Sequence, residues 1–274
     1  MTSAAGRPYA EVIGDPIVHS KSPLIHGFWL ERLGIAADYR ATHVQPQQLS
    51  EFVENRRTDP AWRGCNVTIP HKIAILDHID DPGGIRDTIG AANTVFRDDN
   101  DNLICTNTDA AGFYAPLSQT DLAGRSAVIV GAGGAALAVL FALSKIGIGT
   151  VDIVARNPIK AMGLLTRFGL RGQVRGFDAP LPPAALLINA SPLGMTGQDP
   201  YVPDLGRLDP QAMVYDLVYA PLETPLLAAA RAEGLDVIDG LDMLIGQAAT
   251  AFELFFGQAA PREDDMALRA LLTA

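Results

Sequence analysis

Two polar segments in the first 110 residues carry side chains that could move a proton. The first is Asn66-Val67-Thr68-Ile69-Pro70-His71-Lys72, where an apolar strand ends in Asn and Thr and a lysine follows. The second is Asn107-Thr108-Asp109, directly ahead of a predicted helix. A lysine and an aspartate that face each other can hold a proton ready for transfer to a substrate oxygen. Taken singly, Lys72 reads as a solvated surface lysine and Asp109 as a helix N-terminal residue, so the hypothesis depends on the pair.

A pair of serines marks the start of the first predicted helix. The segment His19-Ser20-Lys21-Ser22-Pro23 closes the first strand, and Pro23 suits the first position of a helix. Two hydroxyls beside free helix N–H groups suit a carboxylate ligand. The alternative is that Ser22 only caps the helix. Both interpretations stay open on these residues alone.

A glycine-rich turn, residues 131–136, follows the apolar run Ser126–Val130. Its sequence is Gly131-Ala132-Gly133-Gly134-Ala135-Ala136, and an amphipathic helix comes next. Glycine at the first position allows the tight turn, glycine at the third lets the backbone approach a pyrophosphate, and a small sixth residue keeps helix and strand close. The same pattern can occur as a bare turn, but a strand before it and a helix after it favour dinucleotide binding.

The end of the next strand indicates which dinucleotide is bound. An NAD site usually carries Asp or Glu there, to accept hydrogen bonds from the ribose hydroxyls. This chain has Val154-Ala155-Arg156-Asn157-Pro158-Ile159-Lys160 instead, without a carboxylate. Arg156 and Lys160 can clamp a 2′-phosphate, and Asp152 lies on the wrong side of the strand to replace the missing acid. The sequence therefore predicts NADP as cofactor.

Strand and helix patterns alternate along the whole chain, which predicts the α/β fold class with mainly parallel sheets. Strands are expected at Tyr9–Gly14, Tyr39–Val44, Cys65–Ile69, Thr94–Arg97, Leu103–Thr106, Ser126–Val130, Thr150–Val154, Leu186–Asn189, Met213–Leu217 and Val237–Ile238. Helices are expected at Pro23–Leu33, Gln47–Asn55, Leu241–Phe256 and Asp264–Leu272, and also from Pro70 and from Asp109. Lys72 would then stand in the first turn of its helix, where a cation opposes the helix dipole.

These elements group into two domains with a cleft between them. Residues 1–107, completed by the C-terminal helices 241–274, are predicted to form an N-terminal substrate-binding catalytic domain with a mainly parallel sheet. Residues 108–240 are predicted to form a C-terminal Rossmann-type NADP-binding domain around the glycine-rich turn. More than a hundred residues precede that turn, which is enough chain for a separate domain that carries the substrate.

Composition narrows the class of partner. The chain has 274 residues, 48% of them hydrophobic, and a net charge of −10, which speaks against nucleic acid or an anionic membrane as main partner. Cys65 and Cys105 fit a reduced compartment and lack the spacing of metal ligands, so no metal is expected. No apolar stretch is long enough to span a membrane, and no secretion signal is visible. We expect a cytoplasmic protein, a monomer or homodimer, that acts on a small molecule.

Together, the ordered motifs resemble the shikimate dehydrogenase family. They are V-I-G-D-P-I-V-H-S-K-S-P, N-V-T-I-P-H-K, G-A-A-N-T, N-T-D, V-G-A-G-G-A-A, N-A-S-P-L-G-M, D-L-V-Y-A-P-L-E-T-P-L-L and G-L-D-M-L-I-G-Q-A, and they extend from about residue 9 to residue 258. The resemblance implies an NADP-dependent oxidoreductase that interconverts 3-dehydroshikimate and shikimate.

The resemblance also implies a role for individual residues. Lys72 and Asp109 match the catalytic pair, Ser20 and Ser22 the ligands of the substrate carboxylate, and Tyr219 a residue that closes over the substrate. The residues that would bind ring hydroxyls are Asn66, Thr68, Asn93 and Gln247. Those that would bind the cofactor are Gly131, Ala132, Gly133, Gly134, Ala135, Ala136, Arg156, Asn157, Lys160, Leu217 and Gly240. Whether Lys72 donates the proton or mainly stabilises the oxyanion stays open.

Four positions depart from the family pattern, and alternative functions remain. Ala155, Leu137, Ala110 and Asp242 stand where the family usually has Asn, a polar or basic residue, Gly and Gly. The first alternative is a quinate or dual quinate/shikimate dehydrogenase, which the serine pair disfavours because quinate-directed relatives tend to replace the second serine. Another alternative is a nucleotide-sensing regulator without activity, which the presence of both Lys72 and Asp109 disfavours. A methylene-bridged amino-acid or folate dehydrogenase would not explain the serine pair.

Overall fold

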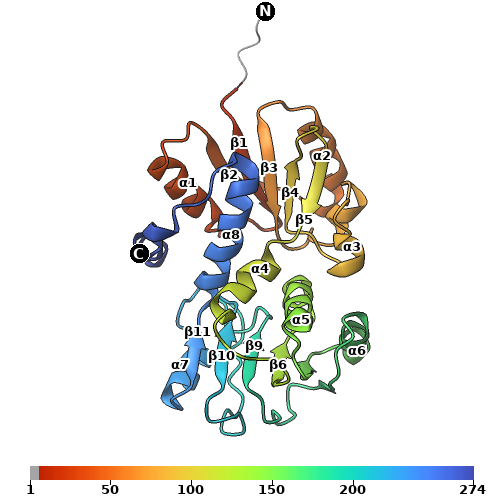
Figure 1. The fold of residues 1–274 in the computed structure, drawn as a ribbon, viewed down its shortest axis with the longest axis vertical. Coiled ribbons are helices and arrows are strands. Elements are labelled where there is room, and N and C mark those ends of the chain that lie inside the picture. The colour runs from red at the N-terminus through yellow and green to blue at the C-terminus, as the bar shows by residue number, and fades with distance from the viewer. Residues whose placement is uncertain (1–5) are drawn as a thin grey trace, which may run out of the picture. The chain divides into compact units, whose positions relative to one another are not determined.

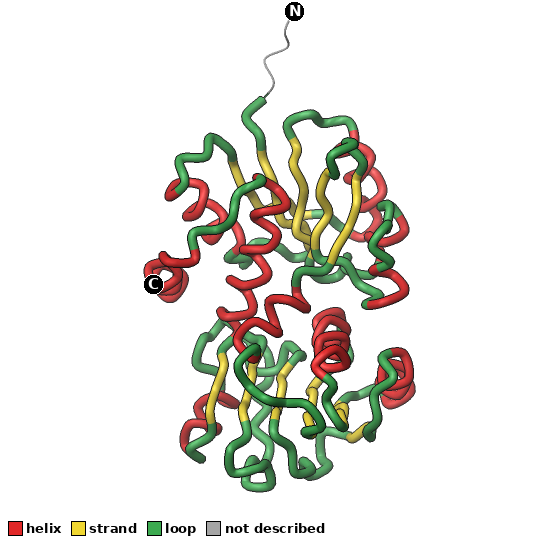
Figure 2. The backbone as a smooth tube through the Cα atoms, viewed as in Figure 1, coloured by secondary structure: helices red, strands yellow, loops and turns green. Residues whose placement is uncertain are grey.

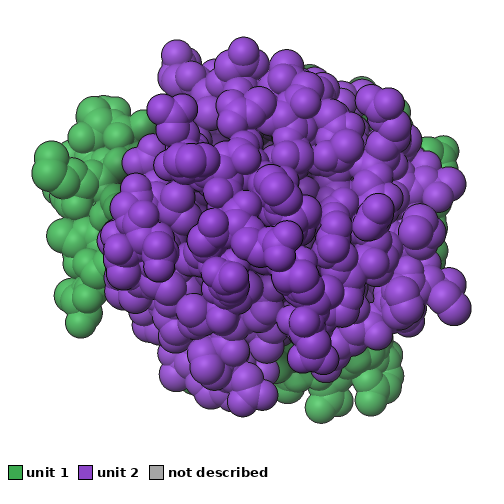
Figure 3. Space-filling view, turned by 90° about the horizontal axis from the view of Figure 1, so that it is seen from below, with its two compact units in different colours: residues 1–108, 247–274 green, residues 109–246 purple. Residues whose placement is uncertain are grey.

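The computed structural model describes residues 6–274, and the chain divides into two compact units. Unit 1 comprises Met1–Thr108 with Gln247–Ala274, and unit 2 comprises Asp109–Gly246 (Figure 3). The first five residues of the predicted N-terminal domain lie outside the described residues. The second boundary falls six residues later than the boundary expected at 240/241, because it lies inside one continuous helix, α8 (Gly240–Phe256).

Unit 1 is built on a five-stranded mixed sheet of order β2-β1-β3-β4-β5 (Figure 1). The strands are β1 (Tyr9–Gly14), β2 (Asp38–His43), β3 (Trp62–Val67), β4 (Thr94–Arg97) and β5 (Leu103–Thr106). The first three are parallel, and the last two form the antiparallel hairpin that the polar run Asp98–Asn102 predicts. All five strands expected in this part of the chain are present. β3 begins three residues earlier than expected, at the buried Trp62.

Helices cover both faces of this sheet. They are α1 (Ser22–Arg32), α2 (Leu49–Arg57), α3 (Ile85–Thr88), the second part of α8, and α9 (Asp265–Thr273), with short 3₁₀ turns at Pro46–Gln48, Ala74–Asp77 and Arg262–Asp264. On one face, Phe52 of α2 belongs to the apolar core around Ile13. On the other face, Trp29 of α1 packs edge-on against Phe252 of α8 at 5.5 Å between ring centroids.

In unit 1 one local expectation is wrong, and one alternative that the sequence left open is excluded. No α-helix begins at Pro70: residues 69–73 form turns, and only the 3₁₀ turn Ala74–Asp77 follows. A residue distant in sequence stabilises this turn, because the Ala92 amide donates to the Lys72 carbonyl at 2.8 Å. Lys72 therefore does not stand in the first turn of an α-helix and opposes no helix dipole. Ser22 does not cap α1 either, since Lys21 occupies the N-cap position and no side chain among the described residues caps the helix.

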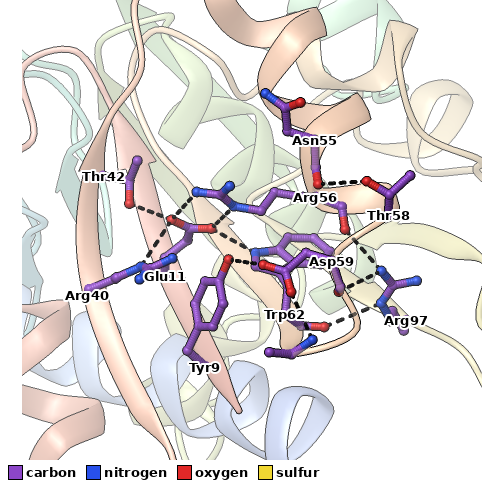
Figure 4. A network of polar contacts seen from close by, with 11 residues as sticks. Tyr9, Glu11, Arg40, Thr42, Asn55, Arg56, Thr58, Asp59, Trp62 and Arg97 are labelled. Atoms are coloured by element: carbon purple, nitrogen blue, oxygen red, sulfur yellow. Dashed lines mark hydrogen bonds and ion pairs between the residues drawn. The ribbon is translucent and has the colours of Figure 1, made fainter. Parts of the chain in front are cut away.

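A buried carboxylate, Glu11 on β1, joins three elements of unit 1 (Figure 4). Its Oε1 accepts from Arg56 Nε on α2 at 2.6 Å and from Trp62 Nε1 on β3 at 2.8 Å. Its Oε2 accepts from the Thr42 hydroxyl on β2 and lies 3.8 Å from Arg40 Nε. A buried charge requires partners of this kind, and these fix α2 and the neighbouring strands to β1.

Unit 2 is built on a six-stranded parallel sheet of order β11-β10-β9-β6-β7-β8. Figure 2 draws the strands of both sheets in yellow. Read from β8, the strand order in unit 2 is the order 3-2-1-4-5-6 of a dinucleotide-binding doubly wound fold. The strands are β6 (Ser126–Val130), β7 (Thr150–Val154), β8 (Val174–Arg175), β9 (Leu186–Asn189), β10 (Met213–Asp216) and β11 (Asp236–Ile238). The helices are α4 (Asp109–Tyr114), α5 (Gly134–Ile146), α6 (Pro158–Arg167), α7 (Pro225–Ala232) and the first part of α8, with a 3₁₀ turn at Ala115–Leu117. The sequence predicted each strand except the two-residue β8.

Candidate active site

A network of buried, uncharged polar side chains lies in unit 1 where β3 ends and β4 begins. Asn66, near the end of β3, is 5% exposed and donates from Nδ2 to the Thr94 hydroxyl at 3.1 Å. Thr94 in turn donates to Asn93 Oδ1 at 3.0 Å. Buried amides and hydroxyls with satisfied partners hold one conformation, so these groups are preorganised at the edge of the sheet.

The network continues through Asn93 to helix α8. Asn93 is 1% exposed, and its Nδ2 donates to the Thr108 hydroxyl at 2.9 Å and to Gln247 Oε1 at 3.4 Å. The Thr108 amide donates back to Asn93 Oδ1 at 2.7 Å. Three of the predicted substrate-binding residues, Asn66, Asn93 and Gln247, are thus brought together although 181 residues separate the first from the last.

The serine pair reaches the same network through a tyrosine that the sequence reading did not single out. The Tyr39 hydroxyl on β2 donates to Asn66 Oδ1 at 2.6 Å, and a side-chain hydrogen bond joins it to Ser22. Burial raises the pKa of the Tyr39 hydroxyl well above its ordinary value, so it stays a neutral donor. Ser20 accepts from the Ser22 amide at 3.3 Å, which orients its hydroxyl at the start of α1.

Thr68 and Lys72 lie just beyond β3, on the turn described above. Gly14, the last residue of β1, lets Thr68 approach, because a Cβ at Gly14 would stand 2.6 Å from Thr68 Cγ2. The buried His71 anchors the turn with Nε2 at 2.6 Å from the Val44 carbonyl. Lys72 itself is half-buried. These contacts hold the lysine on a fixed backbone at the carboxyl end of the parallel strands, where open α/β sheets bind ligands.

Asp109 and Tyr219 belong to unit 2. Asp109 is 4% exposed and begins α4, and the residue before it is Thr108 of the unit 1 network. Tyr219 is half-buried in the loop after β10, and burial raises the pKa of its hydroxyl. Each lies in its predicted motif; their roles toward Lys72 and the substrate remain predictions.

The glycine-rich turn of unit 2 has the shape that a dinucleotide requires. Gly131 has φ = 108°, a value that favours glycine, and a Cβ there would stand 2.9 Å from the Ala190 carbonyl oxygen. Apart from Gly133 itself and its chain neighbours, no described residue comes within 4 Å of a Cβ position at Gly133, which leaves room for a ligand at the turn. Helix α5 begins at Gly134 without a side-chain cap from the described residues, so its first N–H groups suit phosphate oxygens.

The end of β7 presents two cations and no free acid. Arg156 and Lys160 are exposed, and Asn157 between them caps α6 by accepting from the Lys160 amide at 3.0 Å. Asp152 is turned to the neighbouring strand, where Arg175 Nε donates to it at 2.6 Å and the Gln173 amide at 2.9 Å. The prediction that Asp152 cannot serve the ribose agrees with this geometry.

The remaining predicted cofactor residues, Leu217 and Gly240, are neighbours. A Cβ at Gly240 would stand 2.5 Å from the carbonyl oxygens of Leu217 and Val218. Only glycine therefore lets the start of α8 lie against the loop that follows β10.

Sequence reasoning missed three members of the unit 1 network: Tyr39, Thr94 and Thr108. The two threonines stand inside motifs already quoted, beside Asn93 and Asp109, and their positions there were the available signal. Tyr39 carries no such signal, because its contact with Asn66 depends on the register of β2 and β3 on either side of β1. Within residues 6–274 no group of three His, Cys, Asp or Glu is placed to hold a metal, and no helix is long and apolar enough to cross a membrane.

Unit 2 combines a doubly wound sheet, an open glycine turn and a basic strand end, and unit 1 carries a buried polar network. This combination defines a dinucleotide-dependent oxidoreductase of two α/β units. The comparisons with known proteins specify the family. The model for the shikimate dehydrogenase substrate binding domain matches residues 12–95, and that for the shikimate 5'-dehydrogenase C-terminal domain matches residues 240–267.

Individual relatives agree with the family models. The chain is 61% identical to shikimate dehydrogenase (NADP(+)) of Sphingopyxis alaskensis over 274 residues, all of both chains. It is 36% identical, with a TM-score of 0.83, to Thermus thermophilus shikimate 5-dehydrogenase solved with NADP(H) and shikimate, over 97% of this chain and 99% of that one. Quinate dehydrogenase of Corynebacterium glutamicum, solved with NAD, is more distant in sequence at 28% identity, with a TM-score of 0.85 over 97% and 99%. The chain belongs to the shikimate dehydrogenase family.

Proposed function

We propose that this protein catalyses the reversible NADPH-dependent reduction of 3-dehydroshikimate to shikimate. The observation that carries the proposal is the buried network of unit 1, which joins Asn66, Asn93 and Gln247 through hydrogen bonds. Amides and hydroxyls of this kind suit a ligand rich in hydroxyl groups, because a site built to hydrogen-bond a hydroxyl strongly rejects analogues that lack it. The 61% identity to a NADP-dependent shikimate dehydrogenase supports the same reaction.

NADP fits the residues of unit 2. The pyrophosphate would lie on the turn from Gly131 to Ala136, beside the first N–H groups of α5. The 2′-phosphate would meet Arg156, Asn157 and Lys160, and the engaged Asp152 leaves no acid there to repel it. Leu217, in the loop after β10, and Gly240, at the start of α8, would contact the cofactor. When bound, the nicotinamide supplies or accepts a hydride.

The chain's own groups bind the substrate and handle the proton. Ser20 and Ser22 would bind the substrate carboxylate. The network residues Asn66, Asn93 and Gln247, with Thr68, would bind the ring hydroxyls, and Tyr219 would close over the substrate. In the reduction, Lys72, assisted by Asp109, would donate a proton to the ketone oxygen as it becomes an alkoxide; in the oxidation it would accept that proton. The anchored turn at residues 70–73 serves this step because it limits where the ammonium can move.

Replacement of the lysine tests the catalytic role. We expect Lys72→Ala to lower kcat by about a thousandfold, within the range that a positioned acid–base group contributes. The KM for shikimate should stay within about threefold, because the carboxylate and hydroxyl ligands remain. Steady-state assays of shikimate oxidation give both constants. Lys145→Ala, an exposed lysine on α5, is the matched control and should keep wild-type kcat. Activity of Lys72→Ala within a few-fold of wild type would remove Lys72 from the chemistry.

A substrate and cofactor matrix tests the reaction itself. Shikimate and quinate are each assayed with NADP⁺ and NAD⁺, and shikimate with NADP⁺ should have the highest kcat/KM. A higher kcat/KM for quinate with NAD⁺ would identify a quinate dehydrogenase, which the more distant relationship at 28% identity does not favour. No turnover in any of the four combinations would refute the enzymatic proposal. The cytoplasmic location and the monomeric or homodimeric state remain predictions from the sequence.

A further inference from the structure

A second buried polar network lies in unit 2, centred on the carboxylate of Asp216 at the end of β10. Asp216, Asn189 and Thr224 are each fully buried. Asp216 Oδ1 accepts from Asn189 Nδ2 at 2.9 Å and from the Val218 amide at 3.0 Å, and Oδ2 accepts from the Thr224 hydroxyl at 2.7 Å. None of these residues has a part in the substrate and cofactor contacts described above.

The donors come from two loops that leave the carboxyl ends of neighbouring strands. Asn189 ends β9, and its Oδ1 accepts from both the amide and the hydroxyl of Ser191, at 3.1 and 2.7 Å. Its Nδ2 also donates to the Leu193 carbonyl at 2.9 Å, and the Ser191 hydroxyl accepts from the Leu193 amide at 3.2 Å. The loop at residues 189–193 is thus wound around Asn189, and Asn189 is fastened to Asp216.

Thr224 closes the second loop, residues 217–224, against the same carboxylate. Its hydroxyl, while donating to Asp216, accepts from the Leu227 amide at 3.2 Å and so caps α7. The loops are also joined directly, since the Thr196 amide and hydroxyl both donate to the Ala220 carbonyl, at 2.8 and 3.1 Å. Residues 189–196 and 217–224 therefore form one hydrogen-bonded body at the edge of the sheet.

These two loops border the place where one half of the dinucleotide must lie. In a doubly wound sheet the cofactor crosses the switch point, which here falls between β6 and β9. With the adenosine phosphate on the β7 side, the nicotinamide half is left for β9 and β10. The Ala190 carbonyl is the atom closest to a Cβ position at Gly131, and the second loop carries Leu217 and Tyr219.

We propose that Asp216, with Asn189 and Thr224, is a positioning element for the nicotinamide ring, setting the shape of the two loops on which the ring rests. This inference rests on the proposed function, which places NADP on unit 2. An ionised carboxylate only accepts hydrogen bonds, so it can gather donors from both loops at once. Burial raises the pKa of Asp216, and the three donors oppose that rise. A buried polar network costs stability compared with an apolar core. Its presence here therefore indicates that the loop conformation it specifies has a function.

Two substitutions cut the network at opposite ends. Thr224→Val keeps the shape of the side chain and removes the hydroxyl, and Thr224→Ser restores the hydroxyl. Ser191→Ala removes one donor to Asn189 without touching a helix cap. Ser126→Ala is the matched control, because the Ser126 hydroxyl donates to a backbone carbonyl, Pro183 at 3.3 Å, at the opposite edge of the same sheet.

The measurements are the Kd for NADPH, kcat and KM, and the primary deuterium isotope effect with NADPH labelled at the transferred hydrogen. We expect Thr224→Val to lower kcat/KM for NADPH by about tenfold, Ser191→Ala by about threefold, and both to change the isotope effect. Thr224→Ser and Ser126→Ala should match wild type within about twofold. All assays are run well below each variant's melting temperature.

Several outcomes would overturn the proposal. If Thr224→Val and Ser191→Ala lower only the melting temperature and keep the wild-type Kd and isotope effect, the network supports the fold alone. If Thr224→Val does not fold, Ser191→Ala with unchanged kinetics is sufficient to refute it. A wild-type protein that binds NADPH but does not reduce 3-dehydroshikimate would refute the proposed function instead. In that case an unchanged Kd for NADPH in both variants refutes the positioning role, and a weakened one supports it.

Discussion

Arg156 follows the end of β7, and Asp152 lies within that strand, yet only one of the two is available to a ligand. Arg156 is exposed, whereas Asp152 is engaged by Arg175 and the Gln173 amide. The choice between NAD and NADP at this position depends on which charge faces the adenosine ribose. A carboxylate accepts hydrogen bonds from the ribose hydroxyls of NAD, whereas a guanidinium pairs with the 2′-phosphate of NADP. We therefore expect the selectivity for NADP to reside in the exposed guanidinium of Arg156 and in Lys160, at the start of α6.

Replacement of that guanidinium should separate the two cofactors. We expect Arg156→Gln to raise the KM for NADP⁺ by roughly ten- to a hundredfold, the effect of losing one or two hydrogen bonds between charged groups. The KM for NAD⁺, which has no 2′-phosphate, should change by less than about twofold, and steady-state kinetics with both cofactors at saturating shikimate measure the difference. Arg207→Gln removes another exposed arginine of unit 2 and is the control. An equal rise for both cofactors would refute the phosphate contact.

The predicted site residues differ in how far the sequence could place them. Asn66, Asn93 and Gln247 were predicted, and one hydrogen-bonded network contains all three. Tyr39 could not be predicted, since Tyr39 and Asn66 pair with Ala10 and Val12 of the strand between them and meet only once that register exists. The spacing within a motif predicts site residues that are close in sequence, at the end of a strand or in a turn. Contacts between residues on different strands can be identified only once the sheet is assembled.

At the level of elements, α1 and α8 pack through a buried histidine. His26 is fully buried and stacks on the Tyr39 ring with 3.9 Å between centroids. Phe252 and Phe255 of α8 lie 5.8 and 6.0 Å from it, and neither ring nitrogen has a hydrogen-bond partner among residues 6–274. The imidazole therefore behaves as an aromatic core residue, and burial lowers its pKa to about 3.

This histidine should make the fold sensitive to acid. The pKa of about 3 in the folded chain lies below the ordinary 6.5, so the unfolded chain binds more protons between these values. The free energy of unfolding is then fully retained above pH 6.5 and falls as the pH drops, by on the order of 3 kcal/mol at pH 4. His26→Leu should remove most of this loss, measured by urea unfolding at pH 7 and pH 4.

The comparison uses the pH dependence within each variant, since leucine also changes the packing at pH 7. His78→Asn, at a half-buried histidine of unit 1, should keep the wild-type difference between the two pH values. A His26→Leu protein that loses as much stability toward pH 4 as the wild type would assign the acid sensitivity to other groups.

Long, regular elements could be predicted from the sequence, and the turns between them could not. β1 and β6 agree with the expected bounds because apolar residues and glycines mark their ends. The sequence after Pro70 predicts the start of a helix. The Lys72 carbonyl instead accepts a hydrogen bond from the Ala92 amide, twenty residues further along the chain, and the segment forms turns. β8 has two residues and no pattern of its own, and it exists because β7 offers a free edge.

At the scale of the whole molecule, charge is distributed unevenly. The chain carries 31 acidic and 21 basic residues, a net charge of −10, yet both proposed ligands are anions. Between Lys145 and Arg175 there are six lysines and arginines and one acid, Asp152. This segment contains β7, α6 and β8, the part of unit 2 that would receive the adenosine phosphates. A local positive field in an acidic protein attracts a polyanion to one place.

NADPH binding should therefore weaken with salt despite the negative net charge. We expect the Kd to rise by about three- to tenfold between roughly 20 and 200 mM NaCl, since added ions screen the field over about a Debye length. The double variant Arg167→Gln/Arg171→Gln removes two cations outside the proposed contacts and should flatten this dependence, while Arg207→Gln should preserve it. Fluorescence titrations of NADPH across the salt series measure the slope. If the double variant keeps the wild-type slope, the charges of Arg167 and Arg171 have no part in NADPH binding, and the salt dependence comes from the direct contacts of Arg156 and Lys160.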